Sequence, residues 1–318
     1  MIAYIIRRLI WALVILVLLT AVLFFALRLL PGDPLMIYVA QSRNANISPQ
    51  ALQMMRHEYG LDRSLIVQYL SWANDVVHGN LGHSIFYNQN VSKLIAQRLP
   101  ITLQIGLGAF VIATILGTLT GLMAGLRRGK LADQIVTPLA YIGITVPVFW
   151  LGILLIYLFG VNLHWLPTSG YTSPFTNFWL NARQLVMPVI CECVLGLATM
   201  SRQMRSSVLE VRSADYIRTA WAKGLRERYI VIKHMLKNCL IPIVTLMGFA
   251  IGTIFGGAVL IETVFDIPGM GRLMVNSIFN HDYVVLQATT LMFGAIVILV
   301  NLIVDVSYGW LDPRIRYS

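Results

Sequence analysis

Long apolar runs dominate the chain. A bilayer core needs about 20 predominantly apolar residues per helix. Asp, Glu, Lys and Arg are absent from five stretches, at residues 9–27, 99–126, 134–182, 238–261 and 283–304. Four of these stretches each predict one membrane-spanning helix. The third is longer, and it predicts one span near 135–160 followed by a polar, aromatic loop.

A sixth span is expected near residues 185–203, where Glu192 interrupts the apolar run. A charge deep in a bilayer costs at least about 2.5 kcal/mol on insertion scales, so this carboxyl should face the helix bundle or a wet cavity. Two roles stay open for Glu192, a place in a transport pathway and a structural hydrogen bond. Pro147 is a candidate for bending a helix around such a pathway, with ordinary packing as the alternative.

The composition agrees with an all-α polytopic membrane protein of six transmembrane helices. Hydrophobic residues make up 57% of the chain and charged residues 12%, and the mean hydropathy is +0.72. A soluble domain carries about 25% charged residues. The first run, 9–27, exceeds the apolar core of a secretory signal peptide, and no small-residue cleavage site follows it. We therefore expect an uncleaved first span.

The net charge of +10 is consistent with two interpretations, nucleic-acid binding and the positive-inside bias of membrane proteins. The basic residues favour the second reading, because they gather in short segments, at Arg7 and Arg8, 127–130, 202–237, and Arg314 and Arg316. With six spans, this distribution places both termini in the cytoplasm. We expect the lipid bilayer as a partner and no nucleic acid.

The polar segments complete the predicted organisation, which has four parts: a first transmembrane helix (1–30), an external helical segment (31–98), a five-helix core (99–308) and a cytoplasmic tail (309–318). Turn and capping residues in the external segment predict two amphipathic helices, from about Ser48 to Gly60 and from about Asp62 to Gly79. These helices either cap the membrane domain or form a docking surface or gate for an external partner.

The segment 202–238 lies within the core, between the fourth and fifth spans. An apolar stripe among charges predicts a helix, Gly224 predicts its end, and a second helical run is expected over 226–238. From this pattern alone two interpretations stay open. The segment docks onto a cytoplasmic protein, or it lies on anionic lipid.

One motif favours the first interpretation. Residues 215–225, Asp-Tyr-Ile-Arg-Thr-Ala-Trp-Ala-Lys-Gly-Leu, resemble the coupling-loop motif of bacterial ABC importer permeases. Further pieces occur in the family's order, at 31–34, 79–84, 98–103, 262–265, 268–273, 282–283 and 312–317. Together they resemble the dipeptide/oligopeptide/nickel permease family, and within it the B-type subunit of dipeptide permeases. Trp221 departs from the family, which often has Arg there, and Lys237 stands where the general motif often closes with Pro.

The resemblance implies a type I ABC importer transmembrane domain that forms half of a translocation pathway in a bacterial or archaeal cytoplasmic membrane. It implies ATPase contact through the coupling residues, apolar at Tyr216, Ile217, Ala220 and Leu225 and polar at Arg212, Arg218 and Lys223, with Asp215, Thr219 and Gly224 in the same motif. Glu192 and Pro147 are the candidate pathway residues. No metal site is expected, because His78 and His83 flank a glycine turn without a third ligand.

The implied partners are a second homologous permease in a heterodimer, two ABC ATPase subunits and an extracytoplasmic solute-binding protein that docks on 31–98 and 262–283. This chain lacks a G-x-x-x-x-G-K-[ST] phosphate loop, so we expect no cofactor on it and ATP and Mg²⁺ on the ATPase subunits. Short peptides are the first candidate for the cargo. Glutathione-like peptides, nickel chelates and sugars stay open as alternative cargoes.

Two rival functions agree less well with the sequence. A secondary transporter driven by an ion gradient favours inverted repeats with several charges at mid-membrane, and the sequence has no clear repeat and one deep carboxylate. A membrane-embedded protease needs H-E-x-x-H or paired acids in two spans, and the sequence has neither. A permease subunit, which is not itself an enzyme, is therefore the predicted function.

Overall fold

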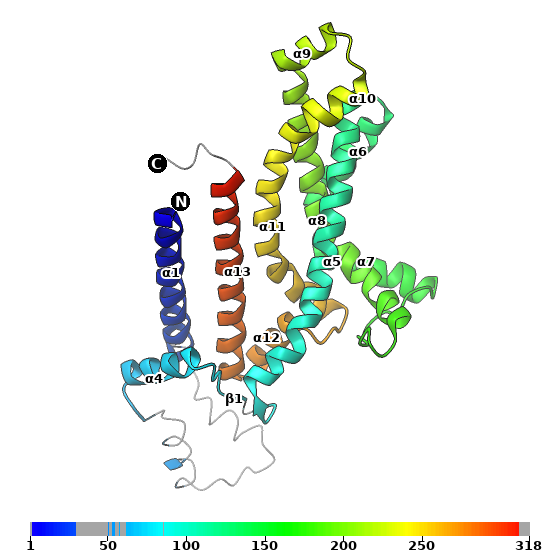
Figure 1. Ribbon diagram of the computed structural model, residues 1–318. Coiled ribbons are helices and arrows are strands. Elements are labelled where there is room, and N and C mark those ends of the chain that lie inside the picture. The colour runs from blue at the N-terminus through cyan, green and yellow to red at the C-terminus, as the bar shows by residue number, and fades with distance from the viewer. Residues whose placement is uncertain are drawn as a thin grey trace. The chain divides into compact units, whose positions relative to one another are not determined.

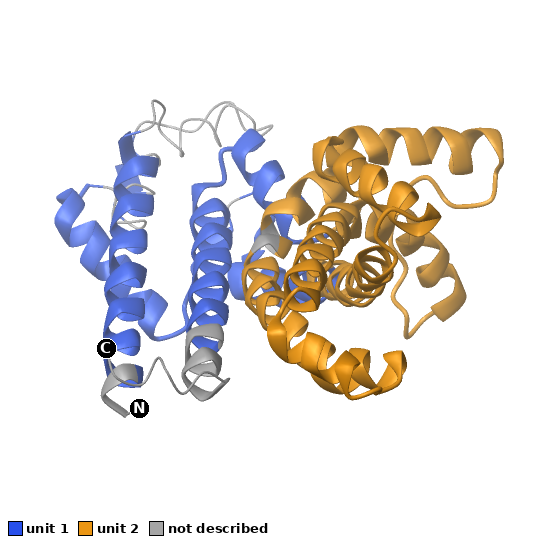
Figure 2. Ribbon diagram, turned by 90° about the horizontal axis from the view of Figure 1, so that it is seen from above, with its two compact units in different colours: residues 1–101, 269–318 blue, residues 102–268 orange. Residues whose placement is uncertain are grey.

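The computed structural model describes residues 2–29, 50, 53–54, 57, 62–84 and 86–311. The regular secondary structure of this part is helical apart from one antiparallel ribbon, in which β1 (His83–Ser84) pairs with β2 (Gln89–Asn90). Five of its helices are long and apolar enough to cross a membrane, and a bent helix pair adds a sixth candidate span. The predicted all-α polytopic fold is confirmed. The chain divides into two compact units, residues 1–101 with 269–318 and residues 102–268 (Figure 2).

In the first unit, α1 (Ile2–Leu29) packs along α13 (Tyr283–Leu311). A Cβ at Gly294 would collide with Leu19, so this glycine allows the two helices to approach closely. Near one end of α1 lies α4 (Leu65–Val77) (Figure 1). The ring of Phe24 is 5.5 Å from that of Tyr69 on α4, and Thr20 Oγ1 shares a 3.1 Å hydrogen bond with the Tyr69 hydroxyl.

The second helix predicted within 31–98 is present as α4, with a later start. Ser64 is its N-cap and Gly79, at φ +79°, follows its end. The first predicted external helix, from about Ser48 to Gly60, lies outside the described residues apart from isolated positions. The next helix, α5 (Val91–Leu126), begins eight residues before the predicted boundary at residue 99, because apolar residues at helical spacing already start at Val91.

Those first turns of α5 belong to the core of the first unit. Val91, Leu94 and Ile95 pack with α12 (Met270–Phe279) and with the start of α13. The buried Ser84 hydroxyl donates a 2.5 Å hydrogen bond to Asp282, which also accepts from the backbone N–H of Val285 in the first turn of α13. The ribbon is thereby attached to α13.

The second unit holds the remainder of α5 with α6 (Leu131–Thr145), α8 (Phe178–Arg212) and α11 (Leu236–Val264). Gly117, Gly121 and Gly125 recur every four residues along α5. A Cβ at Gly121 would run into the carbonyl oxygen of Ser201, and one at Gly125 would lie 2.7 Å from Val208 Cβ. Since small residues at this spacing let helix backbones approach, α5 and α8 are in close contact.

The span predicted near 135–160 is instead a bent pair. After α6, the chain turns by 105° into α7 (Val148–Leu155), which continues as the π-helical segment η1 (Ile156–Asn162). Pro147 lies at the break, and Val146 before it has extended backbone with ψ 123°, as the residue preceding a proline prefers. The bend expected at Pro147 is therefore present.

The longest helix of the second unit, α8, begins at Asn177, whose side chain accepts a 3.0 Å hydrogen bond from the Leu180 N–H. It continues well beyond the predicted span of 185–203. Near its far end, Arg205 forms a two-point ion pair with Asp133 at the start of α6, with N–O distances of 2.6 and 3.0 Å. The carboxylate also accepts hydrogen bonds from Gly129 N–H and the Thr137 hydroxyl.

Candidate functional site

Most of the predicted coupling residues lie on a short helix at one end of the second unit, and the others flank it. This helix, α9 (Asp215–Ala222), follows α8, and α10 (Glu227–Tyr229) with the π-helical η2 (Ile230–Met235) returns the chain to α11 (Figure 1). Ile217 is 0% exposed and Ala220 6% exposed. Both belong to a continuous apolar cluster shared by four elements, with Met200, Met204 and Val208 of α8, Ile230 and Met235 of η2, and Cys239 and Ile243 of α11.

This burial changes the roles expected for three residues. Ile217, Ala220 and Leu225 were expected as apolar contacts to a partner, but Ile217 and Ala220 are buried in the chain's own cluster and Leu225 packs against it. An amphipathic helix buries its apolar side, and here the covering side chains come from the same chain. These residues therefore hold α9 in place, and Tyr216 is the predicted apolar contact that is exposed, at 46%.

Gly224 ends α9 in a Schellman motif. Its N–H bonds to the carbonyl of Trp221 at 2.9 Å, and the N–H of Leu225 bonds to that of Ala220 at 3.4 Å. Gly224 has φ +70°, a left-handed conformation that disfavours residues with a Cβ, and a Cβ there would meet nothing within 4 Å. The predicted helix stop at Gly224 is confirmed, and the space above it is open.

The exposed side of α9 carries polar residues beside Tyr216 and Trp221, which are 46% and 44% exposed. Arg218, Thr219 and Lys223 are exposed, and Arg218 pairs with Asp215 at 3.6 Å across one helical turn. Both partners of this pair are solvated, so it contributes little stability. Arg212 donates instead to the carbonyl of Leu126 at 3.1 Å, where a positive charge is favoured at the carboxyl end of α5. Arg212 therefore has a binding partner within its own chain.

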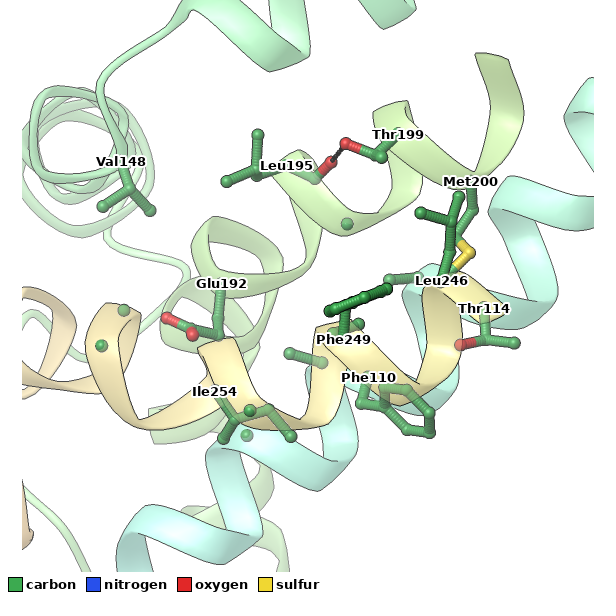
Figure 3. A pocket seen from close by; sticks show the side chains of 18 residues that line it. Phe110, Thr114, Val148, Glu192, Leu195, Thr199, Met200, Leu246, Phe249 and Ile254 are labelled. Atoms are coloured by element: carbon green, nitrogen blue, oxygen red, sulfur yellow. Dashed lines mark hydrogen bonds between the residues drawn. The ribbon is translucent and has the colours of Figure 1, made fainter. Parts of the chain in front are cut away.

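A cavity of about 560 Å³ lies among α5, α8 and α11, with Val148 of α7 also in its lining (Figure 3). Its lining is mostly apolar and includes Phe110, Met200, Leu246, Phe249 and Ile254. Cavities of this size and character hold small ligands in proteins. Glu192 is the charged residue of this lining, so the structure places the predicted deep carboxyl at a cavity. Pro147 is adjacent to a lining residue in sequence and is not part of the lining itself.

The Glu192 carboxylate lies against Gly257 of α11. A Cβ at Gly257 would collide with the carboxylate oxygens. The carboxylate can therefore occupy this place only because residue 257 is a glycine. Its Oε2 atom is buried and has no hydrogen-bond partner in the described part of the chain. The structural hydrogen bond that had stayed open for Glu192 is therefore not observed for this oxygen. The neighbouring Gly256–Gly257 pair inside an apolar helix was the sequence signal for such a close approach.

Sequence reasoning also missed the burial of Glu262. Glu262, expected in an external loop, lies within α11, is 0% exposed and accepts a 2.5 Å hydrogen bond from the Thr102 hydroxyl of α5. The partners are 160 positions apart, so no local pattern links them. Among the described residues, no group of three or more His, Cys, Asp or Glu side chains comes together as a metal site.

The cavity and α9 share structural elements. Met200 lines the cavity and is also a member of the apolar cluster that buries Ile217 and Ala220. Leu246 and Ala250 of α11 line the cavity too and pack against the same cluster. The cluster that buries α9 therefore includes side chains that also border the cavity.

Comparison with known proteins identifies the family. Residues 117–317 match the model of the binding-protein-dependent transport system inner membrane component, and residues 1–106 match the N-terminal model of the same component. The chain is 41% identical over 321 residues to the "Putative peptide permease protein" of Brucella ovis, covering 100% of both. It is 38% identical over 314 residues to the "Probable peptide ABC transporter permease protein" of Sinorhizobium fredii, covering 99% of both.

A third relative carries a more specific name. The chain is 37% identical over 319 residues to the di/tripeptide transport system permease protein DppB of Pseudomonas aeruginosa, covering 94% of both. These matches span the elements described above, including the long apolar helices, α9 and the cavity. The chain therefore belongs to the family of binding-protein-dependent transport system inner membrane components, and it is the multi-pass permease subunit of an ABC importer rather than an enzyme.

Proposed function

We propose that this permease carries short peptides, and that α9 is the element through which ATP-driven motion enters it. The names of the relatives, which are peptide permeases, support the cargo. The packing of α9 supports the proposal that ATP-driven motion enters through this helix. Its inner side is fixed in the chain's own core by Ile217 and Ala220, whereas Tyr216 and the polar residues of its outer side are exposed, where a partner can reach them.

In this proposal α9 occupies a groove on an ABC ATPase subunit. Tyr216, Arg218, Thr219 and Lys223 contact the ATPase, and Gly224 permits a close approach because it has no side chain. Two such ATPase subunits bind ATP and Mg²⁺. Their closure moves α9 as a rigid body, and the shared cluster transmits the movement to α8 and α11 around the cavity. Glu192 and the bend at Pro147 then belong to the pathway whose access changes.

The complete importer contains partners on both sides of the membrane. A second, homologous permease forms the other half of the pathway. A solute-binding protein delivers cargo to the external segments, 31–98 and 262–283. Within the latter, Glu262 is buried, and the exposed Ile278 and Phe279 of α12 are the available apolar contacts. The chain is then a protein of the bacterial or archaeal cytoplasmic membrane with both termini in the cytoplasm, following its basic residues.

The exposed Gly224 carries the coupling proposal, and its substitution tests it. Gly224→Asp adds backbone strain of about 1–2 kcal/mol and a carboxylate on the proposed contact surface. We expect at least tenfold less ATPase subunit to co-purify with the importer, and peptide-dependent ATP hydrolysis to fall in parallel.

A matched control separates contact from strain. Gly79 ends α4 in the same motif, has φ +79°, and a Cβ there also meets nothing within 4 Å. Gly79→Asp therefore carries the same backbone strain away from α9, and it should retain the ATPase subunits. Equal ATPase recovery from both variants would show that α9 is not the docking element.

A further inference from the structure

Two polar atoms that border the cavity lack partners. Glu192 Oε2 and Thr114 Oγ1 are both buried without a hydrogen-bond partner in the described part of the chain. Thr199, the other threonine of the lining, donates to the carbonyl of Leu195 at 2.8 Å and is satisfied. A buried polar atom without a partner is energetically unfavourable, and such an atom in a folded protein calls for an explanation. A ligand that supplies both partners is such an explanation.

The two atoms differ in chemistry. The Glu192 carboxylate accepts hydrogen bonds and attracts a cation, whereas the Thr114 hydroxyl can donate a hydrogen bond to an oxygen. In Figure 3 Glu192 and Thr114 lie toward different ends of the lining, with apolar side chains, including Phe249, between them. A fitting ligand has a cationic group at one end, an oxygen acceptor at the other and an apolar middle.

The helix register gives the spacing of the two groups. A Cβ at Gly196 of α8 would lie 3.1 Å from Ala113 Cβ of α5, so these two residues are level. Glu192 lies four residues before Gly196 on α8, and Thr114 lies one residue after Ala113 on α5. At 1.5 Å rise per residue, the two backbone positions are offset by about 7–8 Å along the helix axes, which is a lower limit for their separation because they lie on different helices. An extended dipeptide spans about 7 Å.

We propose that the cavity is a transit site for a dipeptide with a free amino terminus. The terminal ammonium pairs with Glu192, a carbonyl or carboxylate oxygen accepts from Thr114, and the side chains lie on the apolar walls. Repulsion between Glu192 and the peptide carboxylate fixes this orientation. This assignment rests on the proposed peptide import, and it adds the residues that bind the peptide within the membrane.

The first test measures transport by the whole importer in proteoliposomes, with radiolabelled dialanine on saturating binding protein. Glu192→Gln keeps the size of the side chain and removes its charge, and we expect dialanine uptake per ATP hydrolysed to fall at least about tenfold. Thr114→Val, of similar volume, should lower it severalfold. Glu210→Gln, the same change at an exposed position of α8, is the control and should transport within twofold of wild type.

The second test needs no binding protein. Saturation-transfer NMR compares dialanine with N-acetyldialanine, which lacks the ammonium, on the purified importer. Wild type should prefer dialanine, and Glu192→Gln should bind the two alike. Wild-type uptake by Glu192→Gln, or equal binding of both peptides to wild type, would overturn the site. If the proposed cargo is wrong instead, wild type itself takes up no dialanine, and the NMR comparison still decides whether Glu192 binds ammonium.

Discussion

The Asp133–Arg205 pair fixes the start of α6 to the far half of α8. The Asp133 side chain is 9% exposed and that of Arg205 27% exposed, and the carboxylate accepts four hydrogen bonds in all. A carboxylate with so many donors and a parallel two-point contact is among the stronger polar arrangements in proteins. Removing one partner leaves the other partly buried and unpaired, which is the costly outcome.

We therefore predict that Asp133→Asn lowers the free energy of unfolding by about 2 kcal/mol, less than a fully buried pair because Arg205 is partly solvated. The measurement is thermal unfolding of the full-length chain in detergent. Asp215→Asn is the control, because its pair with Arg218 is 3.6 Å long and its side chain is 98% exposed. That variant should change stability by under about 0.5 kcal/mol. Similar losses in both variants would contradict the assigned role of the buried pair.

At this scale, local roles were predictable and distant partners were not. The helix stop at Gly224 followed from a glycine after an amphipathic run, and the deep position of Glu192 followed from its apolar surroundings. The partners of Asp133 and Glu262, 72 and 160 positions away, have no local signature. The sequence also could not predict which α9 residues are buried by the chain itself. An apolar stripe predicts burial, but it does not identify the protein that covers it.

At the scale of elements, the contact of α5 with α8 depends on the glycine stripe. Both Gly121→Ala and Gly108→Ala should raise helix propensity equally. They differ in packing, because a Cβ at Gly121 collides with the Ser201 carbonyl, whereas one at Gly108 lies 3.7 Å from Val189 in ordinary contact. We predict that Gly121→Ala destabilises the chain by about 1–3 kcal/mol through overpacking.

Thermal unfolding of the two variants in detergent checks this prediction. Gly108→Ala should match wild type or exceed it slightly. A neutral Gly121→Ala would mean that the two helices can separate without loss, and the stripe would then have no packing role.

The elements themselves were predictable to different degrees. The glycine spacing was visible in the sequence, but it does not say which helix lies opposite. The break at Pro147 was expected, while its 105° angle depends on packing that the sequence does not display. The apolar run near 185–203 predicted α8 too short, because the helix continues to Arg212 once its sequence turns polar. The length of an apolar run reflects the thickness of the bilayer, whereas a helix can continue into polar residues beyond it.

At the scale of the whole molecule, family and function were predictable because several short motifs occur in order over the full chain. Orientation has a different basis, the basic residues near α9 and at 127–130. The second unit has two ends that are far apart. The Asp133–Arg205 pair places the start of α6 level with residue 205, about 40 Å along α8 from its start at Phe178, which exceeds the hydrocarbon core of about 30 Å.

Residues 130 and 175 should therefore lie on opposite sides of the membrane. Lys130 is exposed next to the start of α6, and Phe175, before the start of α8, is 99% exposed. Because the proposed orientation places the basic end in the cytoplasm, we predict that a membrane-impermeant maleimide labels Phe175→Cys in intact spheroplasts, and Lys130→Cys only after permeabilisation. The three native cysteines are buried and should react little. Labelling in the reverse order would invert the orientation and place α9 where no ATPase could reach it.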